Sequence, residues 1–484
     1  MKDSSSFPLL TRDADDAIAN ITQDLPLLGG FQGQVRSAEF LLQVNRIAEQ
    51  LPDYGYVINL CDNRYLFTLL FCAALVRGQT SLLPPNKKEL TQTRLNERYG
   101  NVYIAHDWSC LDGIAADIPL FKLSDLEPLL NDGGDDNRNN VHYEPPLIPL
   151  DHLAAISFTS GSTGDSKPNE KSWRTVVESS KINASHMLAG YRESDSTLHQ
   201  LATVPPQHMW GLETSVFFPL FESVCVSDAK PLFPQDIADL LKCLPAPRML
   251  VSAPVHLRAL CASQLNFPVV NLVLCATSPL SDTLALEVEA LLSQSETKMP
   301  SSVNVSELRE VYGCSEVGSM AIRNTAMQAD WQLFTGISLS ENDGGATLAA
   351  TEYLPEPVVL QDRIQVLPSG GFKLAGRDSD MVDMAGKRGS LLELNKMLLS
   401  FPGIIDGVIF IPEPQKKLGR AAKRLAAMVV LPDNVGTLEL KSYLSKHVDD
   451  AFIPRPIIAV SALPREENGK LTAKRLNEHY QAVR

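Results

Sequence analysis

The sequence has no stretch of about 18 apolar residues, the length that crosses a bilayer as a helix. Its longest apolar run, residues 66–76, ends at Arg77 and is typical of a helix inside a protein core. The first twenty residues carry acidic and hydroxyl side chains and lack the basic start and apolar centre of a secretory signal. We therefore expect a cytoplasmic protein without a membrane span.

Two further features are missing. The eight cysteines form no Cys-x-x-Cys pair and no cluster with histidine, so we expect reduced core thiols and neither zinc ligands nor disulfides.

Positive charge is not in excess, because the sequence has 43 Lys and Arg and 57 Asp and Glu, which gives a net charge of −14. This balance argues against a non-specific nucleic-acid or membrane binder and favours small-molecule partners, while it is compatible with a local basic site.

The order of the elements predicts an α/β fold. From residue 230 to 316, short apolar strands alternate with amphipathic helices, which indicates a largely parallel sheet covered on both faces. Beyond residue 376 the pattern changes to mixed α+β, where Ser390 and Glu393 have the spacing of a helix capping box. We expect a large N-terminal domain, residues 1–376, with largely parallel sheets flanked by helices, and a small mobile α+β domain, residues 377–484.

One stretch, residues 153–167, combines a buried strand with a loop suited to phosphate. The apolar run 153–158 leads into Thr-Ser-Gly-Ser-Thr-Gly at 159–164, where small residues leave backbone N–H groups available, and Lys167 adds a cation. It is not a Walker loop, because Asp165 and Ser166 separate the last glycine from the lysine. A plain polar linker is the alternative interpretation.

Two more loops follow predicted strands. They are Thr277-Ser278-Pro279 and Gly313-Cys314-Ser315-Glu316. Ligands of parallel α/β sheets bind at the carboxyl ends of the strands, so we expect these loops to converge with the loop at 159–164.

With these loops in view, the whole chain resembles the adenylate-forming (AMP-binding) superfamily of acyl-CoA synthetases, aryl-CoA ligases, acyl-carrier-protein synthetases and peptide-synthetase adenylation domains. Six segments resemble family motifs in the family's order: TSGSTGDSK, VPPQHMWG, YGCSE, LQDR, GRDSDMVDMAGKR and LPREENGKLTAKRL. The resemblance implies a ligase that uses ATP and Mg²⁺ to activate a carboxylic acid as acyl-AMP, with release of pyrophosphate. The acyl group would then pass to a phosphopantetheine thiol of CoA or of an acyl carrier protein.

The resemblance also implies a role for individual residues of the nucleotide site. Ser315 would contact phosphate, Glu316 would hold Mg²⁺, Tyr312 would stack on adenine, and Asp362 would bind ribose. Lys470 would bridge the acid and the α-phosphate as the catalytic cation. The remaining ATP contacts would come from Thr159, Ser160, Gly161, Ser162, Thr163, Gly164, Lys167, Thr277, Ser278, Gly313 and Arg377. Ordinary structural roles are the alternative: core packing for Tyr312, an ion pair for Asp362 and Arg377, and a solvated side chain for Glu316.

The acid and thiol sites are implied in the same way. His208 would border the acid pocket as a catalytic residue, lined further by Trp210 and Gly211. No Asp stands beside His208 to grip an amino group, so the acid, aryl or fatty, would lack an α-amino group. Gly386 would line the thiol tunnel, and Ser379 would be the hinge of the mobile domain, where an acid or Lys is common in the family.

A basic cluster in the small domain points at the acceptor. We use the name basic cluster for Lys416, Lys417, Arg420, Lys423 and Arg424. It is either a solvated hairpin loop or a dock for an acidic carrier protein or for CoA phosphates. A second function class is also open: a nucleotide-binding scaffold or regulator without catalysis. The presence of Glu316, Asp362, Arg377 and Lys470 together argues against it.

Overall fold

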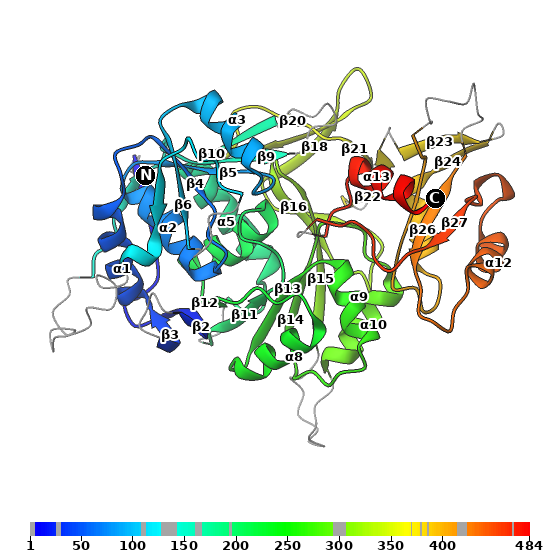
Figure 1. Ribbon diagram of the computed structural model, residues 1–484, viewed down its shortest axis with the longest axis horizontal. Coiled ribbons are helices and arrows are strands. Elements are labelled where there is room, and N and C mark those ends of the chain that lie inside the picture. The colour runs from blue at the N-terminus through cyan, green and yellow to red at the C-terminus, as the bar shows by residue number, and fades with distance from the viewer. Residues whose placement is uncertain are drawn as a thin grey trace.

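The computed structural model describes residues 5–25, 31–107, 113–126, 143–159, 167–192, 196–293, 306–368, 370–377, 380–384, 387–413, 424–466 and 469–484. These residues form a large body with two sheets and their helices, and a small lobe at the C-terminal end of the chain, drawn in orange and red in Figure 1. This arrangement confirms the predicted α/β fold of a large domain followed by a small α+β domain.

The first sheet of the large body lies nearest the N-terminal part of the chain. Among the described residues its strand order is β10 (Lys167–Ser172), β9 (Leu153–Thr159), β5 (Thr80–Leu83), β4 (Tyr56–Asn59), β6 (Val102–His106) and β7 (Leu120–Lys122). All neighbours are parallel except β9 and β10, which form an antiparallel pair. The parallel strands β4 and β5 and the helix between them form a strand–helix–strand unit at 56–83.

Helix α2 (Arg64–Val76) forms the centre of the core beside this sheet. Asn63 caps it, since its side chain accepts hydrogen bonds from the backbone N–H groups of Tyr65 and Leu66. Its side chains from Arg64 to Leu75 are buried on every side, as expected of a helix that is apolar all round. Helix α1 (Ser37–Gln50) packs against it. The longest apolar run is thus a core helix, as predicted.

The second sheet is larger and carries the regular alternation seen in the sequence. Its order in the described part of the chain is β17 (Gln332–Leu333), β16 (Gly318–Arg323), β15 (Glu307–Cys314), β14 (Leu272–Cys275), β13 (Arg248–Ser252), β11 (Leu198–Ala202), β12 (Val224–Ser227), β2 (Ala17–Leu25) and β3 (Phe31–Arg36). The strands from β15 to β2 are parallel, and antiparallel strands lie at both edges.

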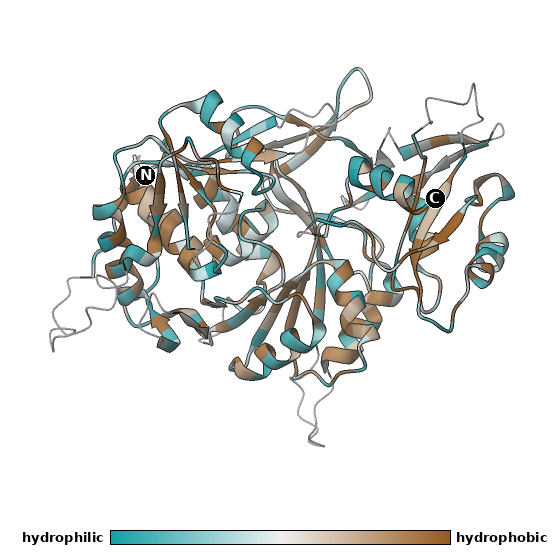
Figure 2. Ribbon diagram, in the orientation of Figure 1, coloured by the Kyte–Doolittle hydropathy of each residue, from teal (hydrophilic) through white to brown (hydrophobic). Residues whose placement is uncertain are grey.

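Both faces of the second sheet are covered. Met249 and Val251 of β13 pack into one hydrophobic cluster, whereas Leu250 between them packs into another on the opposite face. The second cluster also contains side chains of α8 (Pro234–Cys243), α9 (Pro254–Ala262) and α10 (Asp282–Ser293). Because successive side chains of a strand point to opposite faces, this division requires helices or loops on both sides. Figure 2 shows the interior strands as largely brown.

The large body has further elements besides the two sheets and the helices named above. They are β1 (Ser6–Pro8), β8 (Leu147–Pro149), β18 (Ile337–Glu341), β19 (Thr347–Thr351), β20 (Val358–Val359), β21 (Asp362–Val366), β22 (Phe372–Arg377), α3 (Glu89–Tyr99), α5 (Trp173–Met187), α6 (Met209–Leu212), α7 (Phe218–Phe221), the π-helical turn η4 (Glu213–Phe217) and the 3₁₀ turn η2 (Leu123–Leu126).

The small lobe has hydrophobic clusters of its own, built from residues between 382 and 480. Its elements are the hairpin β23 (Met381–Met384) and β24 (Lys387–Ser390), the sheet β25 (Asp406–Phe410), β26 (Ala426–Val430) and β27 (Ile457–Ala459), the helices α11 (Leu391–Leu399), α12 (Thr437–His447) and α13 (Ala473–Val483), and the 3₁₀ turn η6 (Asp450–Phe452). The basic cluster falls between β25 and β26; only Arg424, which is exposed, lies among the described residues.

One local prediction was wrong. Ser390 stands at the start of α11, but its side chain makes no capping hydrogen bond, and its Oγ is buried without a partner in the described part of the chain. Glu393 instead accepts a hydrogen bond from Lys396 at 2.9 Å. The spacing of a capping box is present, but Ser390 makes no capping hydrogen bond and Glu393 pairs with Lys396.

Membrane spans and thiols can be assessed over the described ranges. No helix among those residues is long and apolar enough to cross a membrane. The seven cysteines in those residues are free thiols, and four of them, Cys61, Cys72, Cys225 and Cys275, are buried. Cys110 lies outside the described ranges.

Candidate active site

A cavity of about 820 Å³ lies where the two sheets and the small lobe meet. Val204, Ala276 and Cys314 line it at the carboxyl ends of β11, β14 and β15, and Leu83 and Phe158 line it from the first sheet. Carboxyl ends of parallel strands are where such sheets bind ligands. Side chains of α11 and of the loop before α13 complete the wall from the small lobe.

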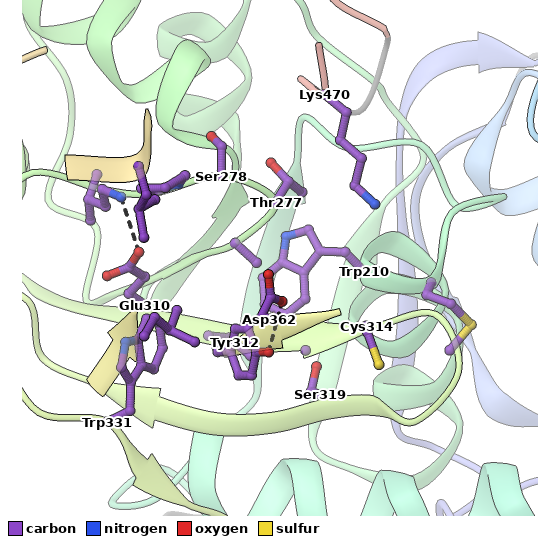
Figure 3. Close-up of a pocket in the computed structure, with 18 of the residues that line it drawn as sticks. Trp210, Thr277, Ser278, Glu310, Tyr312, Cys314, Ser319, Trp331, Asp362 and Lys470 are labelled. Carbon is purple, nitrogen blue, oxygen red and sulfur yellow. Dashed lines mark hydrogen bonds between the residues drawn. The ribbon is translucent and has the colours of Figure 1, made fainter. Parts of the chain in front are cut away.

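Most of the predicted site residues that the structure describes line this one cavity. They are His208, Trp210, Thr277, Ser278, Tyr312, Gly313, Ser315, Asp362 and Lys470. The expected convergence of the Thr277 and Gly313 loops is therefore confirmed, although the two segments lie more than thirty residues apart in the chain. Figure 3 shows Lys470 entering from the small lobe, with Thr277, Trp210 and Asp362 facing the same space.

Tyr312 and Asp362 form a hydrogen-bonded pair in the cavity wall. The Tyr312 hydroxyl donates to Asp362 Oδ2 at 2.9 Å, and the ring packs against Trp331 and Phe372, each with its centroid 5.8 Å away. The ring is thus held on one side by the core while its other side faces the cavity (Figure 3). An aromatic face beside a carboxylate suits a nucleoside, which offers a flat base and ribose hydroxyls.

Thr277 adopts a backbone conformation that β-branched residues rarely take. Its φ is +86°, and its Oγ1 is buried without a hydrogen-bond partner in the described part of the chain. Such strain and an orphaned hydroxyl both cost free energy, of the order of 1–3 kcal/mol for the strain. Because Thr277 lines the cavity, a polar ligand group is the natural partner for the hydroxyl.

Glu310 braces this strained loop and was missed by the sequence analysis. Its carboxylate accepts hydrogen bonds from the backbone N–H of Leu280 at 3.1 Å, from Thr325 Oγ1 at 2.7 Å and from Arg323 Nε at 2.8 Å. Burial raises the pKa of Glu310, and the charge of Arg323 opposes that rise. An alternation of polar and apolar residues in the sequence does not show which polar residue of β15 points inward.

Two of the residues predicted for the acid pocket, His208 and Trp210, line the same cavity. Trp210 is 8% exposed and its Nε1 donates to the carbonyl of Ser252 at 3.3 Å, which fixes the indole in the wall beside His208. Gly211 does not line the cavity. A Cβ at Gly211 would lie 2.0 Å from the carbonyl oxygen of Pro205, so glycine permits the close packing of α6 on the Pro205 segment behind the wall.

A second buried acid, Glu213, was also missed. It lines the cavity, and its two oxygens accept hydrogen bonds from the backbone N–H of Ser319 at 3.0 Å and from Ser319 Oγ at 2.7 Å. Burial raises the pKa of Glu213, while Ser319 and the positive charge of Lys171 lower it. Burial likewise lowers the pKa of Lys171. The charge of each residue thus opposes the pKa shift that burial causes in the other.

Glu316, the predicted magnesium ligand, is half-buried directly after Ser315 but is not among the residues that line the cavity. Lys171 Nζ donates to its main-chain carbonyl at 2.6 Å, so the backbone at this position is fixed. Among the described residues no group of three or more His, Cys, Asp or Glu side chains could hold a metal. A magnesium ion that arrives with ATP needs only one or two carboxylates besides phosphate oxygens and water, and Glu316 fits that requirement.

The segment predicted to bind phosphate falls outside the described residues, except at its ends. Its flanks are β9 and β10, where Thr159 is paired with Lys167, and Lys167 is exposed. Ser160, Gly161, Ser162, Thr163 and Gly164 are not described, nor is the side chain of Thr159. Ser157 and Phe158, near the end of β9, line the cavity.

The remaining predicted positions lie at the connection to the small lobe and beyond it. Arg377 ends β22 opposite Asp362 in the β21–β22 pairing, and its side chain is not described. Ser379, Gly386, Lys416, Lys417, Arg420 and Lys423 lie outside the described ranges.

Lys470 reaches the cavity on a loop that touches the large body. A Cβ at Gly469 would lie 3.2 Å from Val255 Cγ1 and 3.3 Å from the Cβ of Ala253, at the start of α9. Gly469 has φ of +80°, a conformation that glycine adopts without strain. Close approach of the two parts at Gly469 therefore presents the next residue, Lys470, to the cavity.

Comparison with known proteins agrees with this geometry. The family model "AMP-binding enzyme" matches residues 52–343, more than half of the chain. Curated relatives include a 4-coumarate–CoA ligase from Halorhodospira halophila, 24% identical over 336 residues, which are 66% of this chain and 75% of that protein. Gramicidin S synthase 2 from Brevibacillus brevis is 32% identical over 136 residues, so the match covers 27% of this chain and only 3% of that synthase.

Solved structures share the fold over nearly the whole chain. ATP-bound MatB from Rhodopseudomonas palustris has a TM-score of 0.75 at 18% identity, covering 98% of this chain and 97% of that one. The anthranilate CoA ligase AuaEII, in complex with anthranoyl-AMP, has a TM-score of 0.75 at 14% identity, covering 99% and 98%. From the matched family model and this shared two-domain fold, the chain belongs to the AMP-binding enzymes of the adenylate-forming superfamily.

Proposed function

We propose that this protein is an ATP-dependent acid–thiol ligase. It would form acyl-AMP from a carboxylic acid and ATP and then transfer the acyl group to a phosphopantetheine thiol. The observation that carries the proposal is the cavity in which Tyr312 and Asp362, the unpartnered hydroxyl of Thr277, and Lys470 from the small lobe face one space. The 4-coumarate–CoA ligase, matched over three quarters of its length, also supports an acid–thiol ligase.

The first half-reaction joins two anions. An oxygen of the acid attacks the α-phosphorus of ATP, the bond from that phosphorus to the bridging oxygen breaks, and pyrophosphate leaves with the electron pair. Tyr312 would stack on adenine, Asp362 would accept hydrogen bonds from the ribose, and Thr277 and Ser315 would donate to polar groups of the nucleotide. Glu316 would hold magnesium, which supplies positive charge to the phosphates when it is bound.

Lys470 supplies the charge that the reaction itself requires. Its ammonium would lie between the acid carboxylate and the α-phosphate, where negative charge crowds in the transition state. A long, flexible lysine carried by a separate lobe can be delivered after both substrates have bound. We therefore propose the domain boundary after Gly376, with residues 377–484 as the moving lid.

In the second half-reaction the thiol sulfur bonds to the acyl carbon, the thiol proton is released to solvent, and AMP leaves with the electron pair of the broken acyl–phosphate anhydride bond. Gly386 and Ser379 would serve the tunnel and the hinge of this step. The basic cluster would bind the acceptor, CoA or an acidic carrier protein. The acid would be aryl or fatty without an α-amino group, because His208 and Trp210 border the pocket and no Asp stands beside His208.

Pyrophosphate exchange tests the proposal. The protein is incubated with ATP, Mg²⁺, labelled pyrophosphate and one acid from a panel of aryl, fatty and amino acids. Acid-dependent label in ATP is the expected result, with the greatest rate for an acid without an α-amino group. If ATP binds and no acid in the panel supports exchange, the protein is a nucleotide-binding scaffold, and the ligase proposal is wrong.

A further inference from the structure

The loop that carries Lys470 is tied to the core of the small lobe by an ion pair. Arg465 donates from Nε to Asp406 Oδ2 at 2.7 Å and from Nη2 to Asp406 Oδ1 at 2.6 Å. The exposed fractions of the two side chains are only 17% and 9%. Asp406 begins β25, the strand at the edge of the lobe's sheet, so the anchor point belongs to a fixed element.

The third hydrogen bond of Arg465 is directed at the loop itself. Nη1 donates to the carbonyl oxygen of Gly469 at 2.9 Å, on the peptide group that joins Gly469 to Lys470. The backbone N–H of Gly469 donates in turn to the Glu466 carbonyl at 2.8 Å, and the N–H of Glu466 to the Lys470 carbonyl at 2.8 Å. The planar guanidinium thus fixes a carboxylate and a carbonyl at once, which a lysine ammonium cannot do with the same geometry.

A partly buried ion pair is weak evidence for stability, because the desolvation of two charges offsets most of their attraction. Its position has another consequence here. On one side Arg465 holds the peptide before Lys470, and on the other side Gly469 packs against Ala253 and Val255 of the large body. The pKa of His256 in the same part of α9 is lowered by burial and by the charge of Arg465, which agrees with this proximity.

We propose that Arg465 and Asp406 are positioning residues, which hold the backbone at Gly469 so that the Lys470 ammonium is placed in the cavity. The inference rests on the proposed function of Lys470 in adenylate formation. It assigns to the ion pair a role in the first half-reaction alone, since Lys470 has no assigned role in thiol transfer.

The central experiment is a double-mutant cycle of Arg465→Gln and Lys470→Ala, measured by pyrophosphate exchange. We expect Arg465→Gln to lower kcat of exchange roughly 10- to 100-fold, because a displacement of about 1 Å at a catalytic group costs that much. The KM for ATP should change less than about threefold, a small effect because the nucleotide contacts remain in place. In the Lys470→Ala background Arg465→Gln should have no further effect, since its influence passes through Lys470. Independent, multiplicative losses would overturn the inference.

Two variants separate positioning from folding. Arg465→Lys keeps the charge and one hydrogen bond, so it should recover part of the rate. Asp449→Asn is the matched control: it removes the charge partner of Lys387 in the same lobe, in an ion pair that does not include the Lys470 loop, and should leave exchange unchanged. If Arg465→Gln slows thiol transfer from chemically prepared acyl-adenylate as much as it slows exchange, the ion pair is merely structural and the inference is wrong.

A measurement without any acid keeps this inference distinct from the proposed function. Acetylation of Lys470 by acetic anhydride is followed by mass spectrometry, with and without Mg²⁺–ATP. ATP should protect Lys470 in the wild-type protein, and Arg465→Gln should lose that protection. If ATP protects Lys470 equally in both proteins, the positioning role is wrong, whether or not any acid supports exchange. If protection differs as expected but no acid supports exchange, only the proposed ligase activity is refuted.

Discussion

At the scale of single residues, Lys470 is the strongest test of the mechanism. It is largely exposed, yet it reaches into the cavity beside Thr277 (Figure 3). Lys470→Ala should lower the rate of pyrophosphate exchange by about 10²–10³, the usual cost of removing one charged transition-state contact. Transfer from prepared acyl-adenylate to the thiol should stay within a few-fold of wild type, because that step involves other groups.

The matched control for this substitution is Lys474→Ala, an exposed lysine on α13 four residues later. It should change neither half-reaction. Equal loss of both half-reactions in Lys470→Ala would contradict the assignment of Lys470 to adenylate formation.

His256 gives a residue-scale prediction about pH. Its Nδ1 lies 2.8 Å from Thr203 Oγ1, and burial together with the charge of Arg465 lowers its pKa from 6.5 to about 4. Above pH 6.5 the histidine is neutral in both states. As the pH falls from 6.5 towards 4, His256 binds a proton in the unfolded chain but not in the folded protein, so the free energy of unfolding decreases. Down to pH 5 this amounts to at most about 2 kcal/mol.

Thermal unfolding at pH 7.5 and pH 5.0 measures this effect. Glu213 and Glu310 act in the opposite direction, because burial raises the pKa of each, so the quantity to compare is the difference between wild type and His256→Gln. The wild type should lose more of its melting temperature on acidification than the variant, whose glutamine retains a polar partner for Thr203. An identical pH dependence would show that His256 titrates normally in the folded protein.

At the scale of elements, the loop between β27 and α13 is predicted to depend on the absence of one side chain. Gly469→Ala would strain a backbone at φ +80° by about 1–2 kcal/mol and add a carbon atom 3.2–3.3 Å from Val255 and Ala253. We expect pyrophosphate exchange to fall at least about tenfold, because Lys470 is displaced with its loop. Gly403→Ala is the control, since Gly403 has φ of +83° but faces nearly open space. Equal rates for both variants would show that contact at Gly469 has no part in presenting Lys470.

Elements with a strong local pattern could be predicted from the sequence. The run 66–76 became core helix α2, and the alternation after residue 230 became the parallel strands of the second sheet, because periodicity reports burial directly. Ser390 shows the limit of such reasoning: its spacing to Glu393 fits a capping box, yet tertiary contacts decide which partner each side chain meets.

The same limit applies to the residues of the candidate site. The motifs identified Tyr312, Asp362 and Lys470, and the position of a loop after a predicted strand identified Thr277; all four line one cavity. Glu213 and Glu310 could not be identified from the sequence. The partner of Glu213 lies more than a hundred residues away in the chain, and Glu310 is paired across neighbouring strands. In a linear sequence such buried acids look the same as acids on the surface. Gly211 was placed in the pocket by analogy, whereas its surroundings show that it is required by Pro205 behind the wall.

At the scale of the whole molecule, charge is distributed unevenly. The chain carries a net charge of −14, yet the basic cluster between β25 and β26 contributes five positive side chains in nine residues. A field of opposite sign within an acidic protein would attract an anionic partner and orient it, and would repel little else. Because this segment belongs to the small lobe, an acceptor docked there would move with the lobe that is proposed to act as the moving lid.

Charge reversal tests this arrangement. Lys416→Glu, Lys417→Glu and Arg420→Glu together should raise the KM for the thiol acceptor by about tenfold or more, since steering by opposite charge contributes 10- to 10³-fold to association. Pyrophosphate exchange should be unchanged, and the effect should diminish as salt rises towards 0.5 M, where screening shortens the reach of the field. Lys441→Glu with Lys446→Glu on α12 is the control for adding negative charge to the same lobe at exposed positions away from the cluster. CoA and an acidic carrier protein are measured in parallel, and the acceptor is the one whose KM rises. If the KM of neither changes, the basic cluster is a solvated hairpin loop.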